Sequence, residues 1–114
     1  MSERRAADDQ GRREHRVARR DRLAWRGALS DGQLHPGALR DASTHGARIA
    51  VRLSETPAIG TVIKVLERGQ KYPTHFRVVH VRGCDGGAAE VGCERISGRE
   101  YRAARSEAMR KIRA

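Results

Sequence analysis

The chain has 114 residues, of which 38% are hydrophobic and 33% are charged, and its formal net charge is +10. This length leaves room for one domain with one modest core. No apolar run approaches the roughly 20 residues that a membrane-spanning helix needs, and the first ten residues, MSERRAADDQ, lack the apolar region of a secretory signal. We therefore expect a cytoplasmic protein with no membrane insertion.

Arginine dominates the positive charge, since 21 of the 24 basic residues are Arg and three are Lys. A guanidinium donates paired hydrogen bonds to phosphates and to the Hoogsteen edge of guanine, whereas a lysine ammonium acts as a point charge. Five arginines fall within residues 12–20, RREHRVARR, an arginine loop directly ahead of the first strand-like stretch. Residues 1–11 are polar and aperiodic, and we predict that they form a disordered tail.

Alternating apolar residues predict the first part of an antiparallel sheet. Leu23 and Trp25 alternate with more polar neighbours up to residue 28, which is the period of a strand. Ser-Asp-Gly at 30–32 is typical of a hairpin turn. A second strand is expected at 34–40, where Pro36 favours an edge or bulge position. The polar string DASTHG at 41–46 then predicts a turn.

The cleanest alternation of the chain follows this turn. Apolar residues occupy every second position from 47 to 53 and share one face, whereas Arg48, Arg52 and Ser54 fall on the other. The tetrapeptide CDGG at 84–87 predicts a further tight hairpin. The remaining strands are expected at 61–67, 75–82 and 88–96.

The period changes after residue 96. Tyr101, Ala104 and Ala108 recur at helical spacing among arginines and glutamates, and Ser97 with Glu100 fits a capping box. We predict a basic amphipathic helix at 97–113. Together these elements predict an all-β fold, a six-stranded antiparallel β-barrel over 21–96 with a C-terminal α-helix on or beside it.

Two short strings carry the chemistry. Arg12, Arg13 and Arg16 offer guanidinium groups for phosphates and for O6 and N7 of guanine. Asp41 and Ser43 offer oxygen acceptors for the N1–H and N2–H donors of the same base. Gly46 is expected to allow a positive φ in the turn, or a close approach of the ligand to the backbone.

In this order and on this strand plan, the two strings resemble the RxxxR and (D/N)xSxxG motifs of the PilZ domain family, which binds cyclic di-GMP. Arg12 and Arg16 match the first motif, and Asp41, Ser43 and Gly46 match the second. The resemblance covers residues 12 to 110 and includes the six-stranded split barrel with its C-terminal helix. It implies a stand-alone, single-domain member of the family, in which Arg13 assists at phosphate or base.

The resemblance further implies a non-catalytic receptor with no cofactor besides its ligand, cyclic di-GMP. The arginine loop would become ordered over the nucleotide, and an unidentified downstream protein would read the change. The receptor would be a monomer or a ligand-dependent dimer. The sequence itself favours no enzyme, because no nucleophile elbow, phosphate-binding glycine loop or metal-ligand cluster is present.

Several alternatives stay open at this point. Arg16 and Arg20 form a second RxxxR pattern, and His45 either stacks on a base or caps the turn. Cys84 and Cys93 lack metal-site spacing and are expected to be reduced thiols. A small basic barrel that binds nucleic acid without sequence preference is the competing function. We do not favour it, because the four aromatic residues do not line one pair of strands.

Overall fold

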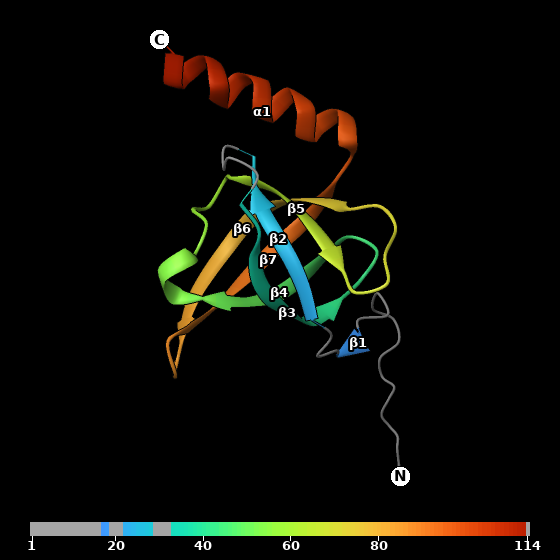
Figure 1. The fold of residues 1–114 in the computed structure, drawn as a ribbon, viewed down its shortest axis with the longest axis vertical. Helices are drawn as coiled ribbons and strands as arrows, with labels where there is room; N and C mark the ends of the chain where they lie inside the picture. Colours follow the sequence, from blue (N-terminus) through green and yellow to red (C-terminus); the bar gives the residue numbers. More distant parts are fainter. Residues whose placement is uncertain (1–16, 19–21, 29–32, 114) are drawn as a thin grey trace.

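A computed structural model describes residues 17–18, 22–28 and 33–113 of the chain. The described part forms a closed antiparallel barrel of six strands with one short additional strand and a C-terminal helix (Figure 1). The elements are β1 (Val17–Ala18), β2 (Arg22–Gly27), β3 (His35–Ala42), β4 (Gly46–Arg52), a 3₁₀ turn (Leu53–Glu55), β5 (Val62–Glu67), β6 (Thr74–Cys84), β7 (Ala88–Ile96) and α1 (Gly98–Arg113). The fold class predicted from the sequence is confirmed.

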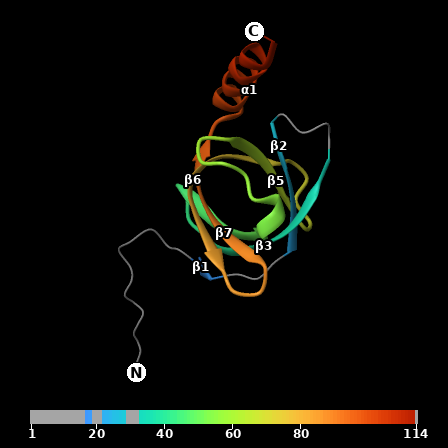
Figure 2. The same ribbon diagram turned by 90° about the vertical axis from the view of Figure 1, so that its left-hand side faces the viewer.

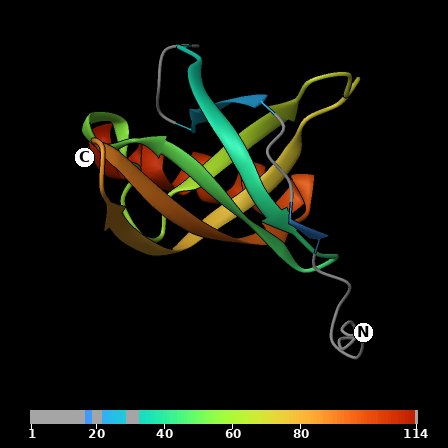
Figure 3. The same cartoon turned by 90° about the horizontal axis from the view of Figure 1, so that it is seen from below.

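The sheet closes because β3 pairs with strands on both of its edges. The strand order is β3-β2-β5-β6-β7-β4, and β3 also pairs with β4. All pairings are antiparallel. The strands cross one another obliquely around the barrel, as the view from below shows (Figure 3). β1 pairs with β3 at Asp41 and Ala42, so β1 and β2 follow one another along the same edge of β3.

The core fills the interior of this barrel. Side chains from every second strand position point inward, as the alternation predicts. Ile49, Ile63, Val78 and Val91 are fully buried, and Trp25 is 3% exposed. Each such side chain contributes roughly 1.5–3 kcal/mol when it leaves water. The barrel interior is therefore a packed core.

The strand predictions differ from the structure at two places. β3 continues through Asp41 to Ala42, with a bulge at Arg40, so Asp41 lies in a strand and the turn is shorter than predicted. Leu53 was expected on the inner face, but it is 53% exposed because the backbone leaves the sheet for the 3₁₀ turn. Pro36 pairs with β2 but has no partner on β4, which suits a residue without an N–H.

α1 packs on one end of the barrel through its first turns. The Ser97 Oγ accepts a hydrogen bond from the Glu100 N–H at 3.0 Å, which confirms the predicted N-cap. Tyr101 is 4% exposed and belongs to a small cluster with Ala28, Val62 and Ile96. The helix then extends beyond the barrel (Figures 1 and 2). No helix in the described part of the chain has the length and hydropathy of a bilayer span.

Candidate functional site

The candidate site lies where β3 ends and β4 begins. Asp41 is only 6% exposed, yet it does not face the core. The bulge at Arg40 places Asp41 opposite Arg48, and Arg48 points outward because its neighbours Ala47 and Ile49 are buried inside the barrel. Asp41 is thus a nearly buried carboxylate on the outer surface of the barrel.

Arg48 is the principal described partner of that carboxylate. Its Nε donates a hydrogen bond to Asp41 Oδ2 at 2.8 Å, and its Nη2 donates to the same oxygen. The Arg48 side chain is 48% exposed, whereas that of Asp41 is 9% exposed. The hydrogen bond to Asp41 raises the pKa of Arg48, burial acts against this, and the charges of Asp41 and Glu90 add to the rise. Arg48 is therefore charged and acts as a counter-ion of Asp41.

Sequence reasoning placed Arg48 on the outer face but missed its pairing with Asp41. The signal was present in the hairpin itself. A turn that begins at Ser43 and closes at Gly46 pairs residue 42 with 47 and residue 41 with 48, which sets an acid opposite an arginine.

Ser43 stands in the turn and holds it closed. Its N–H donates to the Gly46 carbonyl oxygen at 2.8 Å, and its Oγ accepts from the His45 N–H at 3.3 Å. His45 is exposed, and its carbonyl oxygen accepts from the Arg95 N–H of β7 at 2.7 Å. Ser43 and Gly46 also line a cavity of about 70 Å³ at the mouth of the barrel. The turn is thus fixed by the backbone on both sides.

Of the two expectations for Gly46, a positive φ and a close approach of the ligand, the structure tests the first. Its φ is not positive; the glycines with positive φ among the described residues are Gly60, Gly69, Gly86 and Gly87. Instead, β4 approaches β7 closely at this point, and an added Cβ would lie less than 3.0 Å from the Cys93 carbonyl oxygen. A glycine is required here by strand packing, and the expectation of a positive φ was wrong.

The three candidate arginines, Arg12, Arg13 and Arg16, lie outside the described residues, as does the alternative partner Arg20. The residue that directly follows Arg16 is described. Val17 pairs with Ala42, and Ala18 pairs with Asp41. The segment that directly follows the arginine motif therefore lies beside β3, the strand that carries Asp41.

A second acid–arginine pair lies on the same outer face. Glu90 of β7 is 8% exposed and points outward between two buried neighbours. Its Oε1 accepts a hydrogen bond from Arg82 Nη2 of β6 at 2.8 Å. Arg48 stands opposite Gly92, two residues from Glu90 along β7. Asp41, Arg48, Glu90 and Arg82 thus form an acid–arginine series across β3, β4, β7 and β6, which the sequence alone did not reveal.

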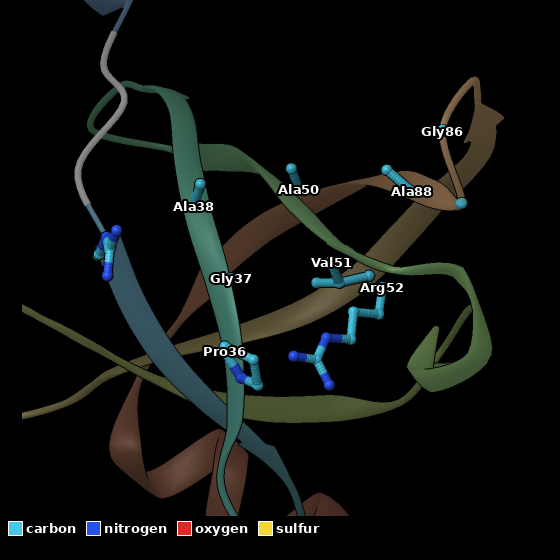
Figure 4. A pocket seen from close by; sticks show the side chains of 10 residues that line it. Pro36, Gly37, Ala38, Ala50, Val51, Arg52, Gly86 and Ala88 are labelled. Atoms are coloured by element: carbon cyan, nitrogen blue, oxygen red, sulfur yellow. The ribbon is translucent and has the colours of Figure 1, made fainter.

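A shallow trough of about 430 Å³ continues along β3 and β4 from this pair. Small side chains, among them Ala38 and Ala50, line its floor, and Arg52 extends across it toward Pro36 (Figure 4). Arg22 also lines the trough. The outer surface of β3 and β4 is therefore open and shallow along this trough, and Arg22 and Arg52 give it a positive charge.

The aromatic residues do not offer a surface for stacking bases. Trp25, Phe76 and Tyr101 are buried, and Tyr72 is the exposed one of the four. Cys84 is exposed, whereas Cys93 is buried, and burial raises the pKa of the Cys93 thiol to about 12. No group of three or more His, Cys, Asp or Glu side chains in the described residues is arranged to hold a metal ion.

Comparison with known families agrees with this geometry. The model of the PilZ domain matches residues 10–107, which span the arginine motif, the barrel and most of the helix. The chain therefore belongs to the PilZ domain family, a family of non-catalytic receptors for cyclic di-GMP. No curated protein matches the sequence.

Proposed function

We propose that the chain is a receptor for cyclic di-GMP that binds the nucleotide through Asp41, Ser43 and Gly46 on the barrel and through Arg12, Arg13 and Arg16 ahead of it. The proposal includes a cytoplasmic location and the absence of catalysis. The observation that supports it is the pairing of Val17 and Ala18 with Ala42 and Asp41, because the residue directly after Arg16 then lies beside the strand that carries Asp41.

The division of labour follows from the donors and acceptors of the ligand. Guanine offers N1–H and N2–H donors that suit the Asp41 carboxylate, and O6 and N7 acceptors that suit an arginine. The two phosphates require fixed positive charge. Charge-assisted hydrogen bonds of this kind are roughly twice as strong as neutral ones. Gly46 and Ser43 support the site by holding the turn against β7.

The receptor acts by changing its own surface. Binding orders the arginine motif over the nucleotide, and a downstream protein reads the new surface. A monomer, or a dimer that forms with the ligand, is compatible with this mode of action.

Isothermal titration calorimetry tests the proposal most directly. Protein at micromolar concentration is titrated with cyclic di-GMP and, separately, with a random-sequence oligonucleotide. We expect saturable heat with the nucleotide and none with the oligonucleotide. Tight oligonucleotide binding without any response to cyclic di-GMP would contradict the proposal.

Two variants test the residues. Arg16→Ala and Asp41→Asn are each expected to abolish binding while the circular dichroism spectrum stays unchanged. Arg99→Ala and Asp85→Asn serve as controls, since both residues are exposed and lie outside the proposed site. The assignment of the site is wrong if the first two variants bind like the controls.

A further inference from the structure

The Asp41 carboxylate that the proposed function assigns to guanine is already occupied. Two N–H groups of Arg48, Nε–H and one Nη2–H, both point at Oδ2 of Asp41. The side chain of Asp41 is 9% exposed. A base can reach this carboxylate only if a group that now contacts it moves away.

Arg48 offers Asp41 the same donor pattern as guanine does. The Nε–H and Nη2–H of a guanidinium are parallel, and so are the N1–H and N2–H of guanine, which belong to a guanidine-like unit of the base. A carboxylate receives such a pair with its two oxygens, and Oδ2 already accepts both groups from Arg48. Because the guanine pair needs Oδ2 as well as Oδ1, the two partners compete for Oδ2.

Arg48 also has a second acid within reach. It stands opposite Gly92, and Glu90 lies diagonally beside it on β7, a separation that long side chains span. Gly92 adds no side chain of its own between them, and the His80 side chain of β6 lies against it from the neighbouring strand. Glu90 is nearly buried and accepts a hydrogen bond from Arg82, so an acidic side chain already lies at this position. Arg48 can leave Asp41 without losing an anionic partner.

From this geometry, and resting on the proposed function, we infer that Arg48 is an internal competitor at the guanine site and sets the affinity of the receptor. In the ligand-free protein Arg48 occupies Asp41. Binding of the guanine edge displaces it toward Glu90, where it shares the acid with Arg82. The displacement of Arg48 from Asp41 on β3 thus changes the contacts of Arg82 on the outer face of β6.

This inference is testable because it predicts effects on affinity that are opposite in sign to those expected from electrostatics alone. Cyclic di-GMP carries two negative charges, so plain electrostatics predicts weaker binding whenever a cation is removed and tighter binding whenever an anion is removed. Competition predicts the opposite at two positions of the series. Arg48→Gln should bind cyclic di-GMP about tenfold more tightly than the matched control Arg52→Gln, which removes the same charge from the same face of β4. Glu90→Gln should bind more weakly than wild type.

A calorimetric titration of the four proteins separates the outcomes. Weaker binding by Arg48→Gln than by Arg52→Gln would show that Arg48 supports or contacts the ligand, and would overturn the inference while leaving the proposed function intact. Tighter binding by Glu90→Gln would overturn it as well. If the wild-type protein does not respond to cyclic di-GMP, the proposed function fails, and the inference fails with it.

A measurement on the wild-type chain covers the case in which a variant does not fold. The Nε–H signal of Arg48 is followed in a ¹⁵N-correlated NMR spectrum, assigned by its absence from the spectrum of Arg48→Lys. Saturation with cyclic di-GMP is expected to shift this signal, because its acceptor changes from Asp41 to Glu90. An unchanged signal at saturation would overturn the inference.

Discussion

Replacement of Gly46 by alanine tests the closest approach of two strands in the barrel. The added Cβ would lie less than 3.0 Å from the Cys93 carbonyl oxygen and 3.3 Å from the Cys93 carbonyl carbon, whereas ordinary contacts fall at 3.4–4 Å. The obstructing atoms belong to the backbone of β7, so no side chain can turn aside. β4 and β7 must therefore separate at the first pair of their ladder, Gly46 with Glu94.

The free energy lost when β4 and β7 separate follows from the known effects of overpacking. Forcing an additional methyl group into a packed site costs about 1–3 kcal/mol, and a rigid backbone neighbour favours the upper half of that range. Each kcal/mol shifts the melting temperature of a domain of about 60–100 residues by roughly 4–8 °C. We expect Gly46→Ala to melt roughly 10–20 °C below the wild-type protein.

The assay is thermal unfolding followed by circular dichroism. Gly83→Ala is the matched control, because Gly83 also lies in a strand and a Cβ there would meet nothing within 4 Å. Its melting temperature should stay within a few degrees of wild type. Equal melting of Gly46→Ala and Gly83→Ala, combined with a loss of cyclic di-GMP binding in the former alone, would refute the packing argument and assign Gly46 to the ligand.

Three further predictions concern the stability and reactivity of the barrel. Tyr101→Ala should lower the free energy of unfolding in urea by about 3–5 kcal/mol, since it empties the cluster that anchors α1, while Tyr101→Phe should change little; equal midpoints for both variants would disprove this anchoring. Burial, with two nearby cations, lowers the pKa of His75 from 6.5, so the stability contributed by its neutral form is complete above about pH 6.5 and is lost as the pH falls below that value. The melting temperature of wild type should therefore drop more between pH 7.5 and 5.5 than that of His75→Gln, and parallel curves would contradict this. In the native protein at pH 8 an aromatic disulfide reagent should titrate Cys84 at once and Cys93 only after unfolding, because the latter thiol is buried with a pKa of about 12; simultaneous reaction of both would show that the barrel opens readily.

Alternation was sufficient to predict most of the barrel. Inward residues such as Ile49 and Val51 recur with period two, and this period fixes both the strand and the face that it buries. It could not foresee the bulge at Arg40, because an inserted residue depends on how β3 meets β4 and leaves no local signature. The bulge is what moves Asp41 from a turn into a strand and onto the outer face.

The candidate site was predictable in its residue types but not in its connections. Asp41 and Ser43 stand together as their motif implies, whereas the pairing of Arg48 with Asp41 was missed although the turn register carries it. Glu90 resembles any outward glutamate in a strand, and only the folded surface shows that it is nearly buried against Arg82. Both pairs join neighbouring strands of a hairpin, 7 and 8 residues apart, but the near-burial of the two acids is a property of the closed sheet that a single sequence does not encode locally.

The two-residue strand β1 has a consequence for the proposed binding of cyclic di-GMP. Its backbone pairing fixes the chain directly after Arg16 beside Ala42, so a base that has bound at Asp41 meets the arginine motif as part of the same molecule. A short tether of this kind corresponds to an effective concentration of about a millimolar or more, without any additional contact. Because the contact with the arginine motif is then intramolecular, a weak first contact on the barrel can become a tight complex. A substitution that unpairs β1 is expected to weaken binding while every side chain of the proposed site stays in place.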